Sequence, residues 1–351
     1  MVFRKGGFLG RLEQWYYGEE RIEVVNRYKY LGYTLTTKLS VDLALAEYAG
    51  KAKGRIVSIF RALYKLGKID MGVFFKLFDS QIKPMLLYGA EIWGMKSREI
   101  IEKVHLFACK KLLGVSSKTP NSFIYHELNR YPLCVDARMK VVKYWAKLLN
   151  LEEERLPKLA YSRECRELDK ENGWGMMLRE YLIVNGFGDI WDDQNGDRVL
   201  GFCKEFKQRQ IDNFWQNEHS NMEESQSRRF VNYLSFKDNH NREQYLKDIR
   251  VPKFRKALTR FRFGVNELRG NRKFLNPQAN RKCPFCVYDE SDDHFLLKCP
   301  TYKDLRVKYL LKFWITLNSV SVKDLVSNDN PEIVKNTATF IFYALQLRER
   351  H

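Results

Sequence analysis

Four side chains that can bind a metal ion lie within seventeen residues near the end of this 351-residue chain. Their spacing, C-x2-C-x7-H-x4-C, brings three potential thiolates and one imidazole within reach of a single tetrahedral zinc ion. Three thiolates, a neutral imidazole and Zn²⁺ carry a net charge of −1, which favours a closed structural site over a catalytic site with an open position. The predicted cofactor is therefore one structural Zn²⁺. Its predicted ligands are Cys283, Cys286, His294 and Cys299.

The alternative to a metal site is a chance grouping of three cysteines and a histidine in a small core. The metal site is favoured because every ligand position is filled and Pro300 follows the last one directly. The remaining cysteines stand singly, which is typical of reduced core or surface thiols rather than of ligands or a disulfide framework. They are Cys109, Cys134, Cys165 and Cys203.

The chain is strongly basic. It has 61 Lys and Arg against 43 Asp and Glu, a formal net charge of +18. Such a surplus is typical of proteins that bind a polyanion, and nucleic acid is the first candidate. No stretch approaches the roughly 18 consecutive apolar residues of a spanning helix, so no membrane partner is predicted. The first residues lack the apolar core of a secretory signal, which predicts an intracellular protein of the nucleus or the cytoplasm.

A dense basic segment precedes the first cysteine of the predicted metal site. Between residues 253 and 274, cations alternate with Phe254, Phe261 and Phe263. Two interpretations stay open: a nucleic-acid surface on which bases stack, or an amphipathic helix whose phenylalanines belong to the core. The cations predicted to contact phosphates are Arg255, Lys256, Arg260, Arg262, Arg269, Arg272, Lys273, Arg281 and Lys282.

The hydrophobic pattern predicts a mainly α protein that begins with short strands before residue 36. The spacing then becomes helical, and the pattern leaves residues 85–93 undecided between helix and strand. Residues 160–250 are more polar and have the least regular pattern, which predicts a linker or a mobile lobe. The predicted helices run from Ser40 to Gly67, Asp70 to Pro84, Ser97 to Gly114, 120 to 129 and 136 to 150.

Several motifs resemble the reverse transcriptases of LINE-type (non-LTR) retrotransposons. They include Tyr28-Lys-Tyr-Leu-Gly32, Leu86-Leu-Tyr-Gly-x-Glu-x-Trp93, Glu127-Leu-x-Arg-Tyr-Pro-Leu133 and the cysteine cluster. The resemblance is nearly collinear over residues 1–150 and returns over residues 255–310. The matching region of that family lies downstream of the polymerase active site. It comprises the end of the palm, the thumb and a carboxy-terminal zinc knuckle.

The resemblance implies a division into five segments. A palm remnant with a primer-grip-like hairpin covers residues 1–36, and a thumb-like helical bundle covers 37–150. A helical connector or mobile lobe follows over 151–250. Residues 251–310 form the basic helix and the zinc knuckle, and residues 311–351 form the carboxy-terminal helices.

The resemblance also implies roles for individual residues. In the family, the primer-grip hairpin helps to hold the primer end, and the thumb follows the phosphates of the duplex. Ordinary strand packing and a solvated charged helix face account for the same residues equally well. The residues concerned are Tyr30, Leu31 and Gly32 in the hairpin and Lys51, Lys53 and Arg55 in the first helix.

Polymerase chemistry needs an acidic constellation that holds two metal ions. The family carries it on an aromatic-x-Asp-Asp hairpin upstream of the matching region, and this sequence shows no equivalent. Asp192-Asp193 adjoins a Gln-Asn-Gly turn and is typical of a solvated loop. His105 and Cys109, one helical turn apart, are predicted to pack rather than to act as base and nucleophile.

The sequence therefore predicts a non-catalytic chain that binds RNA or DNA. The chain would hold this template or target nucleic acid near the catalytic part of a reverse transcriptase. The alternative function is a zinc-stabilised protein-interaction module derived from a retroelement. A metal-dependent nuclease is disfavoured because the acidic cluster that it needs is absent from the sequence.

Overall fold

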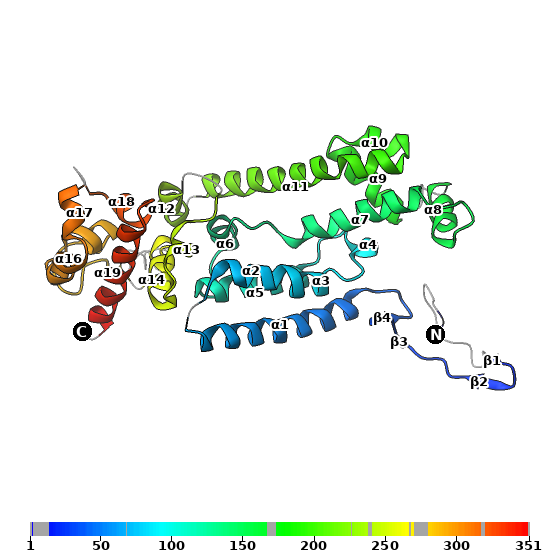
Figure 1. Ribbon diagram of the computed structural model, residues 1–351, viewed down its shortest axis with the longest axis horizontal. Coiled ribbons are helices and arrows are strands. Elements are labelled where there is room, and N and C mark those ends of the chain that lie inside the picture. The colour runs from blue at the N-terminus through cyan, green and yellow to red at the C-terminus, as the bar shows by residue number, and fades with distance from the viewer. Residues whose placement is uncertain are drawn as a thin grey trace. The chain divides into compact units, whose positions relative to one another are not determined.

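The computed structural model describes residues 2, 14–67, 69–166, 173–225, 227–237, 241–266, 268–269, 280–316 and 320–349. Within them the fold is mainly helical, with two short hairpins near the amino terminus (Figure 1), which confirms the predicted fold class. No helix in these ranges is long and apolar enough to cross a membrane.

The chain divides into two compact units. The first unit contains Met1–Ile56, Asp79–Val104 and Pro132–Ile211, and the second contains Val57–Phe78, His105–Tyr131 and Asp212–His351. Each unit combines stretches from several of the five segments implied by the resemblance, so that five-part division stays a prediction.

The two hairpins are antiparallel. Strand β1 (Trp15–Tyr17) pairs with β2 (Glu20–Ile22), and β3 (Arg27–Tyr30) pairs with β4 (Tyr33–Thr36). The β3–β4 turn consists of Leu31 and Gly32, with φ angles of 47° and 83°. Two successive positive φ angles are typical of a type I′ turn, whose twist matches that of the strands.

The helices before residue 150 agree closely with the predicted ones. Helix α1 ends where predicted, because Gly67 adopts a φ of +68° and donates its N–H to the Tyr64 carbonyl. Asp70 caps the next helix by accepting from the Val73 N–H at 3.0 Å. The bounds are Asp42–Lys65 for α1, Met71–Leu77 for α2, Lys83–Leu86 for α3, Ala90–Trp93 for α4, Glu99–Leu113 for α5, Asn121–Leu128 for α6 and Leu133–Leu149 for α7.

Pro84 does not break the chain's helical path, contrary to the prediction. Between α2 and α3 the helix widens into a π-helix at Phe78–Ile82. Pro84 then lies in the first turn of α3, directly after the π-helix, a helix position in which proline is tolerated. The undecided stretch 85–93 is helical, with α3 and α4 joined by a turn in which Gly89 has a φ of +72°.

Most of the described residues between 160 and 250 form helices, joined by short turns, although the sequence pattern there is irregular. The pattern was weak because most positions of the longest helix are polar, although Val199, Phe202, Cys203 and Phe206 do lie on one buried stripe. Asp192-Asp193 is exposed, as expected, but ends a helix instead of lying in a loop. The helices are α8 (Leu156–Arg166), α9 (Trp174–Val184), α10 (Gly188–Asp193), α11 (Gly196–Glu224), α12 (Arg228–Phe236) and α13 (Tyr245–Asp248).

The core of the first unit forms around two stacked tryptophans. The rings of Trp145 and Trp191 lie 5.3 Å apart, and both side chains are buried. The indole N–H of Trp145 donates to the Tyr161 hydroxyl at 2.8 Å, and that hydroxyl donates to the Gln194 amide oxygen. This chain of bonds satisfies the polar atoms of the aromatic core, so their burial carries no unpaired donor.

The second unit is built on α14 (Pro252–Arg262) and α19 (Pro331–Glu349), which pack along each other. Phe261 of α14 stacks on Phe295 at 5.9 Å, and Phe295 also contacts Tyr302 and Phe340. These rings join the basic helix to the segment that carries the metal-ligating residues. Other helices described in this unit include α16 (Lys303–Tyr309), α17 (Leu311–Thr316) and α18 (Val322–Val326).

Candidate metal centre and nucleic-acid surface

The structure brings the four predicted metal ligands together. Their ligating atoms all lie within 4.8 Å of one another, and no other group of His, Cys, Asp or Glu among the described residues forms such a cluster. Two sulfurs bound to one tetrahedral zinc at about 2.3 Å would be about 3.8 Å apart. The Sγ atoms of Cys283 and Cys299 are 3.8 Å apart, and the Cys286 Sγ lies 3.2 Å from the His294 Nε2. These residues, here called the Cys–His cluster, fit a zinc ion in number, type and spacing.

Local backbone bonds build the Cys–His cluster. A single antiparallel bridge joins Lys282 to Asp289, and the Cys283 N–H donates to the Tyr288 carbonyl at 2.8 Å. These two contacts close a turn that returns the chain toward His294. Five residues of π-helix, His294–Lys298, then place the last cysteine, whose N–H donates to the His294 carbonyl at 2.7 Å.

Burial shifts the pKa of two ligands, Cys283 and His294. It is the main cause that raises the pKa of the Cys283 thiol to about 12, and the neighbouring Cys286 and Cys299 thiols act in the same direction. Burial also lowers the pKa of His294, so its ring is the neutral imidazole that a metal requires. Zn²⁺ binds thiolates, so loading the cluster releases protons and supplies the positive charge that crowded sulfurs otherwise lack.

Glu290 attaches the Cys–His cluster to the rest of its unit. Its carboxylate is 1% exposed and accepts two bonds from Arg348 of α19, at 2.9 and 3.0 Å. The Arg269 backbone N–H donates to the same carboxylate, and the Arg269 side chain donates to the Lys282 carbonyl at 3.1 Å. Arg269, predicted to contact phosphate, therefore braces this loop. The side chain of Arg281 is partly exposed, and Lys282 is exposed and paired with Asp289.

The basic helix α14 exposes only part of its charge. Lys256 is exposed and Arg260 partly exposed, and both lie at the end of α5. The Arg260 Nε donates to the Gly114 carbonyl at 3.1 Å, and the Lys256 stem covers Gly114, where an added Cβ would lie 2.8 Å away. Cations are stabilised beside the carbonyls at a helix carboxyl terminus, so this placement also has a structural reason.

Arg255 and Arg262 of the same helix are buried, at 2% and 1% exposure. The Arg255 guanidinium donates to the carbonyls of Ile69 and Ile249, at 2.9 and 3.2 Å. Neither side chain can reach a phosphate, so the predicted contacts of these two residues are wrong. Phe261 and Phe263 are fully buried as well, which decides the open alternative in favour of core packing for them.

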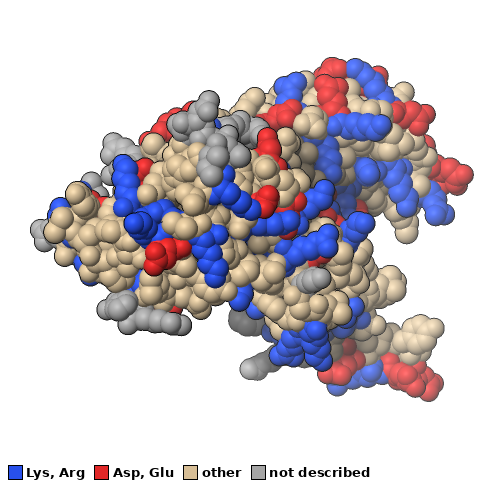
Figure 2. All heavy atoms as spheres, turned by 60° about the vertical axis from the view of Figure 1, so that its left-hand side comes forward, with Lys and Arg blue, Asp and Glu red and all other residues tan. Residues whose placement is uncertain are grey.

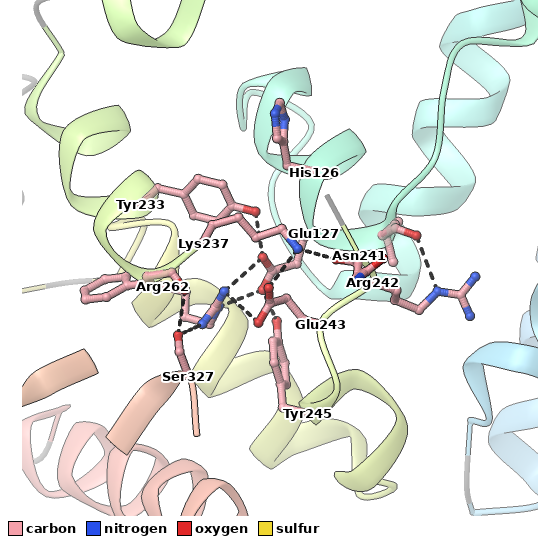
Figure 3. A network of polar contacts seen from close by, with 12 residues as sticks. His126, Glu127, Tyr233, Lys237, Asn241, Arg242, Glu243, Tyr245, Arg262 and Ser327 are labelled. Atoms are coloured by element: carbon pink, nitrogen blue, oxygen red, sulfur yellow. Dashed lines mark hydrogen bonds and ion pairs between the residues drawn. The ribbon is translucent and has the colours of Figure 1, made fainter. Parts of the chain in front are cut away.

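Arg262 lies at the centre of a buried polar network (Figure 3). Its Nε and Nη2 contact the Glu127 carboxylate, at 2.8 and 3.4 Å, and its Nη2 lies 3.0 Å from Glu243. Its Nη1 donates to the Val326 carbonyl at 2.9 Å and to the Ser327 hydroxyl. Burial opposes the charge of Arg262, but Glu127 and Glu243 outweigh burial and raise the pKa of the guanidinium.

Glu127 is fully buried and receives two more hydrogen bonds, from the hydroxyls of Tyr233 and Tyr245 at 2.7 Å each. Burial, and then Glu127 itself, raises the pKa of both phenols well above the ordinary value, so both remain donors. From the sequence, Glu127 has no predicted role beyond its place in the motif. A signal was present, because Glu127 interrupts the apolar run of α6 and a buried carboxylate requires a partner.

The predicted primer-grip tip is an exposed turn with a fixed backbone. The Leu31 carbonyl accepts from the Tyr88 hydroxyl at 2.8 Å, and the Gly32 carbonyl accepts from the Tyr48 hydroxyl at 3.0 Å. Both tyrosines belong to the same unit as the turn, and their rings lie edge to face at 5.7 Å. The side chains of Tyr30 and Leu31 are 58% and 75% exposed. The turn therefore presents an aromatic and an apolar side chain to solvent from an anchored backbone.

The predicted basic face of α1 is exposed but not continuous. Lys51 and Arg55 are four residues apart and share a face, whereas Lys53 lies about 200° around the helix from Lys51. The Arg55 guanidinium donates twice to the Gln81 amide oxygen, at 3.0 and 2.7 Å, and keeps its charge. Lys51 and Arg55 are therefore the pair that one row of phosphates can meet.

Two other predictions concern pairs of side chains. Arg272 and Lys273 lie outside the residues that the structure describes. His105 and Cys109 are both buried, and the His105 ring packs 5.4 Å from that of Phe78, as expected for core residues. Figure 2 shows Lys and Arg side chains on the face that it draws, interspersed with Asp and Glu side chains.

Comparison with known proteins finds one distant relationship. No protein-family model and no solved structure matches the chain. Over 132 residues, 38% of the chain, it is 23% identical to the RNA-directed DNA polymerase from mobile element jockey of Drosophila melanogaster. The match spans 14% of the length of that polymerase. This distant and partial similarity agrees with the resemblance to retroelement reverse transcriptases.

We expect the purified chain to contain about one Zn²⁺, held by the Cys–His cluster, because the four ligands complete a tetrahedral shell. Elemental analysis measures the stoichiometry. Replacing Cys283→Ser together with Cys299→Ser should abolish it, whereas Cys134→Ser, a half-buried cysteine of the other unit, should leave it unchanged. Zinc content that is zero in the parent, or equal in all three proteins, would contradict the site.

Replacing Arg262→Met should lower the free energy of unfolding by about 3 to 5 kcal/mol, because it leaves buried carboxylates without their cation. Urea denaturation followed by tryptophan fluorescence measures the loss. Arg260→Met is the matched control, two residues along the same helix and partly exposed, and should cost about 1 kcal/mol or less. An equal loss in the two variants would show that the network does not hold this unit together.

Proposed function

We propose that this chain is a nucleic-acid-binding portion of a LINE-type retrotransposon reverse transcriptase, from the region carboxy-terminal to the polymerase active site. Its role is to hold template or target RNA or DNA near the catalytic part, without polymerising DNA itself. The observation that carries the proposal is the partial similarity to a retroelement RNA-directed DNA polymerase. The Cys–His cluster and the net charge of +18 support it, because both suit a metal-stabilised protein with a polyanionic partner.

Burial reduces the set of predicted cations that remain candidates for this role. Arg255 and Arg262 are excluded by burial, which leaves exposed or partly exposed cations on both units. On the first unit the predicted ones are Lys51, Lys53 and Arg55 of α1, the helix from which Tyr48 also anchors the hairpin turn. On the second unit the predicted ones are Lys256, Arg260, Arg269, Arg281 and Lys282. Contacts between such cations and phosphates fix position without reading the sequence.

Binding of a primed RNA–DNA duplex should weaken steeply with salt, by about 0.7 to 0.9 in log–log slope for each neutralised phosphate. Replacing Lys51→Gln with Arg55→Gln should therefore reduce the magnitude of the slope by about 1.4 to 1.8. Lys143→Gln with Lys147→Gln, an exposed pair at the same spacing on α7, should leave it nearly unchanged. Fluorescence anisotropy over a salt series measures the slopes.

Two outcomes count against this proposal in different ways. If the parent binds no nucleic acid even at low salt, a zinc-stabilised protein-interaction module becomes the better assignment. If the parent binds but both double variants change the slope equally, the α1 pair has no special place in the interface.

The chain alone should not extend a primer on an RNA template with either Mg²⁺ or Mn²⁺, because its sequence shows no carboxylate constellation for two metal ions. Incorporation of labelled deoxynucleotides measures this activity. Template-dependent synthesis by the pure chain, abolished by a substitution in the chain itself, would prove the non-catalytic assignment wrong.

A further inference from the structure

A cavity of about 620 Å³ lies in the second unit between the α13–α14 link and α19. Its size falls within the range of roughly 300 to 1,000 Å³ that is usual for small-molecule sites. Three cations line it, Lys247 of α13, Arg250 of the link and Lys335 of α19. All three are exposed, and within the described residues none of them makes an ion pair. This cavity, the α13–α14 pocket, therefore offers positive charge that the fold itself does not use.

The amino terminus of α14 adds to this potential. The helix has eleven residues and begins at the pocket, where Val251 occupies the N-cap position without a side-chain hydrogen bond to the first turn. The uncapped N–H groups and the helix dipole favour a negative group at this end. Asp248 is a carboxylate in the lining and works against an anion beside it, but three cations outnumber it.

An aromatic wall distinguishes this pocket from a simple anion site. The Phe254 side chain lines the cavity and is only partly buried. Its ring rests against Phe342 at 5.3 Å and Tyr343 at 6.1 Å, both on α19, so it is held in place. A supported aromatic ring beside cations is the arrangement on which nucleic-acid bases stack while their phosphates are neutralised.

Two polar groups complete the lining. The Thr339 hydroxyl donates its proton to the Lys335 carbonyl at 2.8 Å, so its oxygen faces a ligand as an acceptor only. The Asp248 carboxylate is likewise an acceptor. Acceptors suit the amino group of a base or the hydroxyls of a ribose, whereas the side chains of an acidic peptide carry no donors to match them.

We propose that the α13–α14 pocket binds a single nucleotide unit, with its base against Phe254 and its phosphate between Lys247, Arg250 and Lys335. This inference deepens the proposed function by giving one place where an unpaired residue of the bound strand is held. The pocket is separate from the Cys–His cluster and from the buried network of Arg262, whose residues do not line it.

The charge of the pocket is tested with the full chain and a 5′-phosphorylated single-stranded RNA. Replacing Lys247→Gln, Arg250→Gln and Lys335→Gln together should reduce the magnitude of the salt slope by about 0.7 to 1.4, as for one or two phosphates. The control removes three exposed lysines elsewhere in the same unit, through Lys76→Gln, Lys303→Gln and Lys308→Gln. Equal changes in the two triple variants would overturn the proposal.

The aromatic contact has its own pair of variants. Phe254→Leu keeps an apolar side chain but removes the stacking face, and should weaken RNA binding roughly 5- to 150-fold. Phe254→Tyr keeps the ring and should bind nearly as tightly as the parent. A single 4-thiouridine in the RNA should crosslink to the peptide that contains Phe254. Loss of affinity in the Leu and Tyr variants alike, or crosslinks confined to other peptides, would overturn the assignment of the base.

Titration with a mononucleotide distinguishes an error in the pocket assignment from an error in the proposed function. AMP titrated into the parent should bind, and the triple pocket variant should lose that binding even if the strand contacts lie elsewhere. If the chain binds RNA while AMP does not bind, the proposed function stands and the pocket is wrong. Inorganic phosphate or an acidic peptide that binds as tightly as AMP would also overturn the nucleotide assignment, since neither offers a base.

Discussion

The ion pair between Glu127 and Arg262 is the constraint on which the second unit depends. Both side chains are almost completely buried, and burying an isolated charge there would destabilise the fold by several kcal/mol. The network offsets that cost only when the polar groups of all its elements meet in one place. These elements are α6, α12, the link before α13, α14 and the end of α18. Packing of apolar surface alone would tolerate other arrangements of these helices, but unpaired carboxylates would not.

The segment of the Cys–His cluster and the Arg262 network both contact α14, and the cluster segment also contacts α19. Phe261 of α14 stacks on Phe295, the residue after His294, and Phe295 contacts Phe340 of α19. Glu290, in the loop that carries the ligands, accepts a hydrogen bond from Arg348 of α19. Neither restraint needs a large apolar core. The loop that carries the ligands is short and polar, so a metal ion bound to the cluster, together with the buried Glu290 carboxylate, would supply the stability that so small a segment cannot obtain from hydrophobic burial.

The surplus of positive charge serves two purposes, and the structure separates them. Some cations have structural duties: Arg255 binds carbonyls, Arg262 binds carboxylates, and Arg260 caps the end of α5. Others, such as Lys51 on α1 and Lys247 and Arg250 beside α14, remain exposed and contribute to the field around the molecule. Net charge by itself therefore indicates the kind of partner but overstates the number of contacts, because a buried arginine counts in the total and cannot touch a phosphate.

The sequence by itself determined the helical class, most helix ends before residue 150 and the four residues of the Cys–His cluster, because these depend on local spacing, caps and turn residues. It left Phe261 and Arg262 ambiguous, since an amphipathic basic helix has the same pattern whether its arginines face solvent or a buried carboxylate. Only the tertiary structure decided that Glu127, 135 residues earlier in the chain, receives Arg262. The sequence also did not predict that Phe254 lines a cavity with cations. That arrangement depends on the packing of α19 against α14, and no local pattern encodes a contact between segments so far apart in the chain.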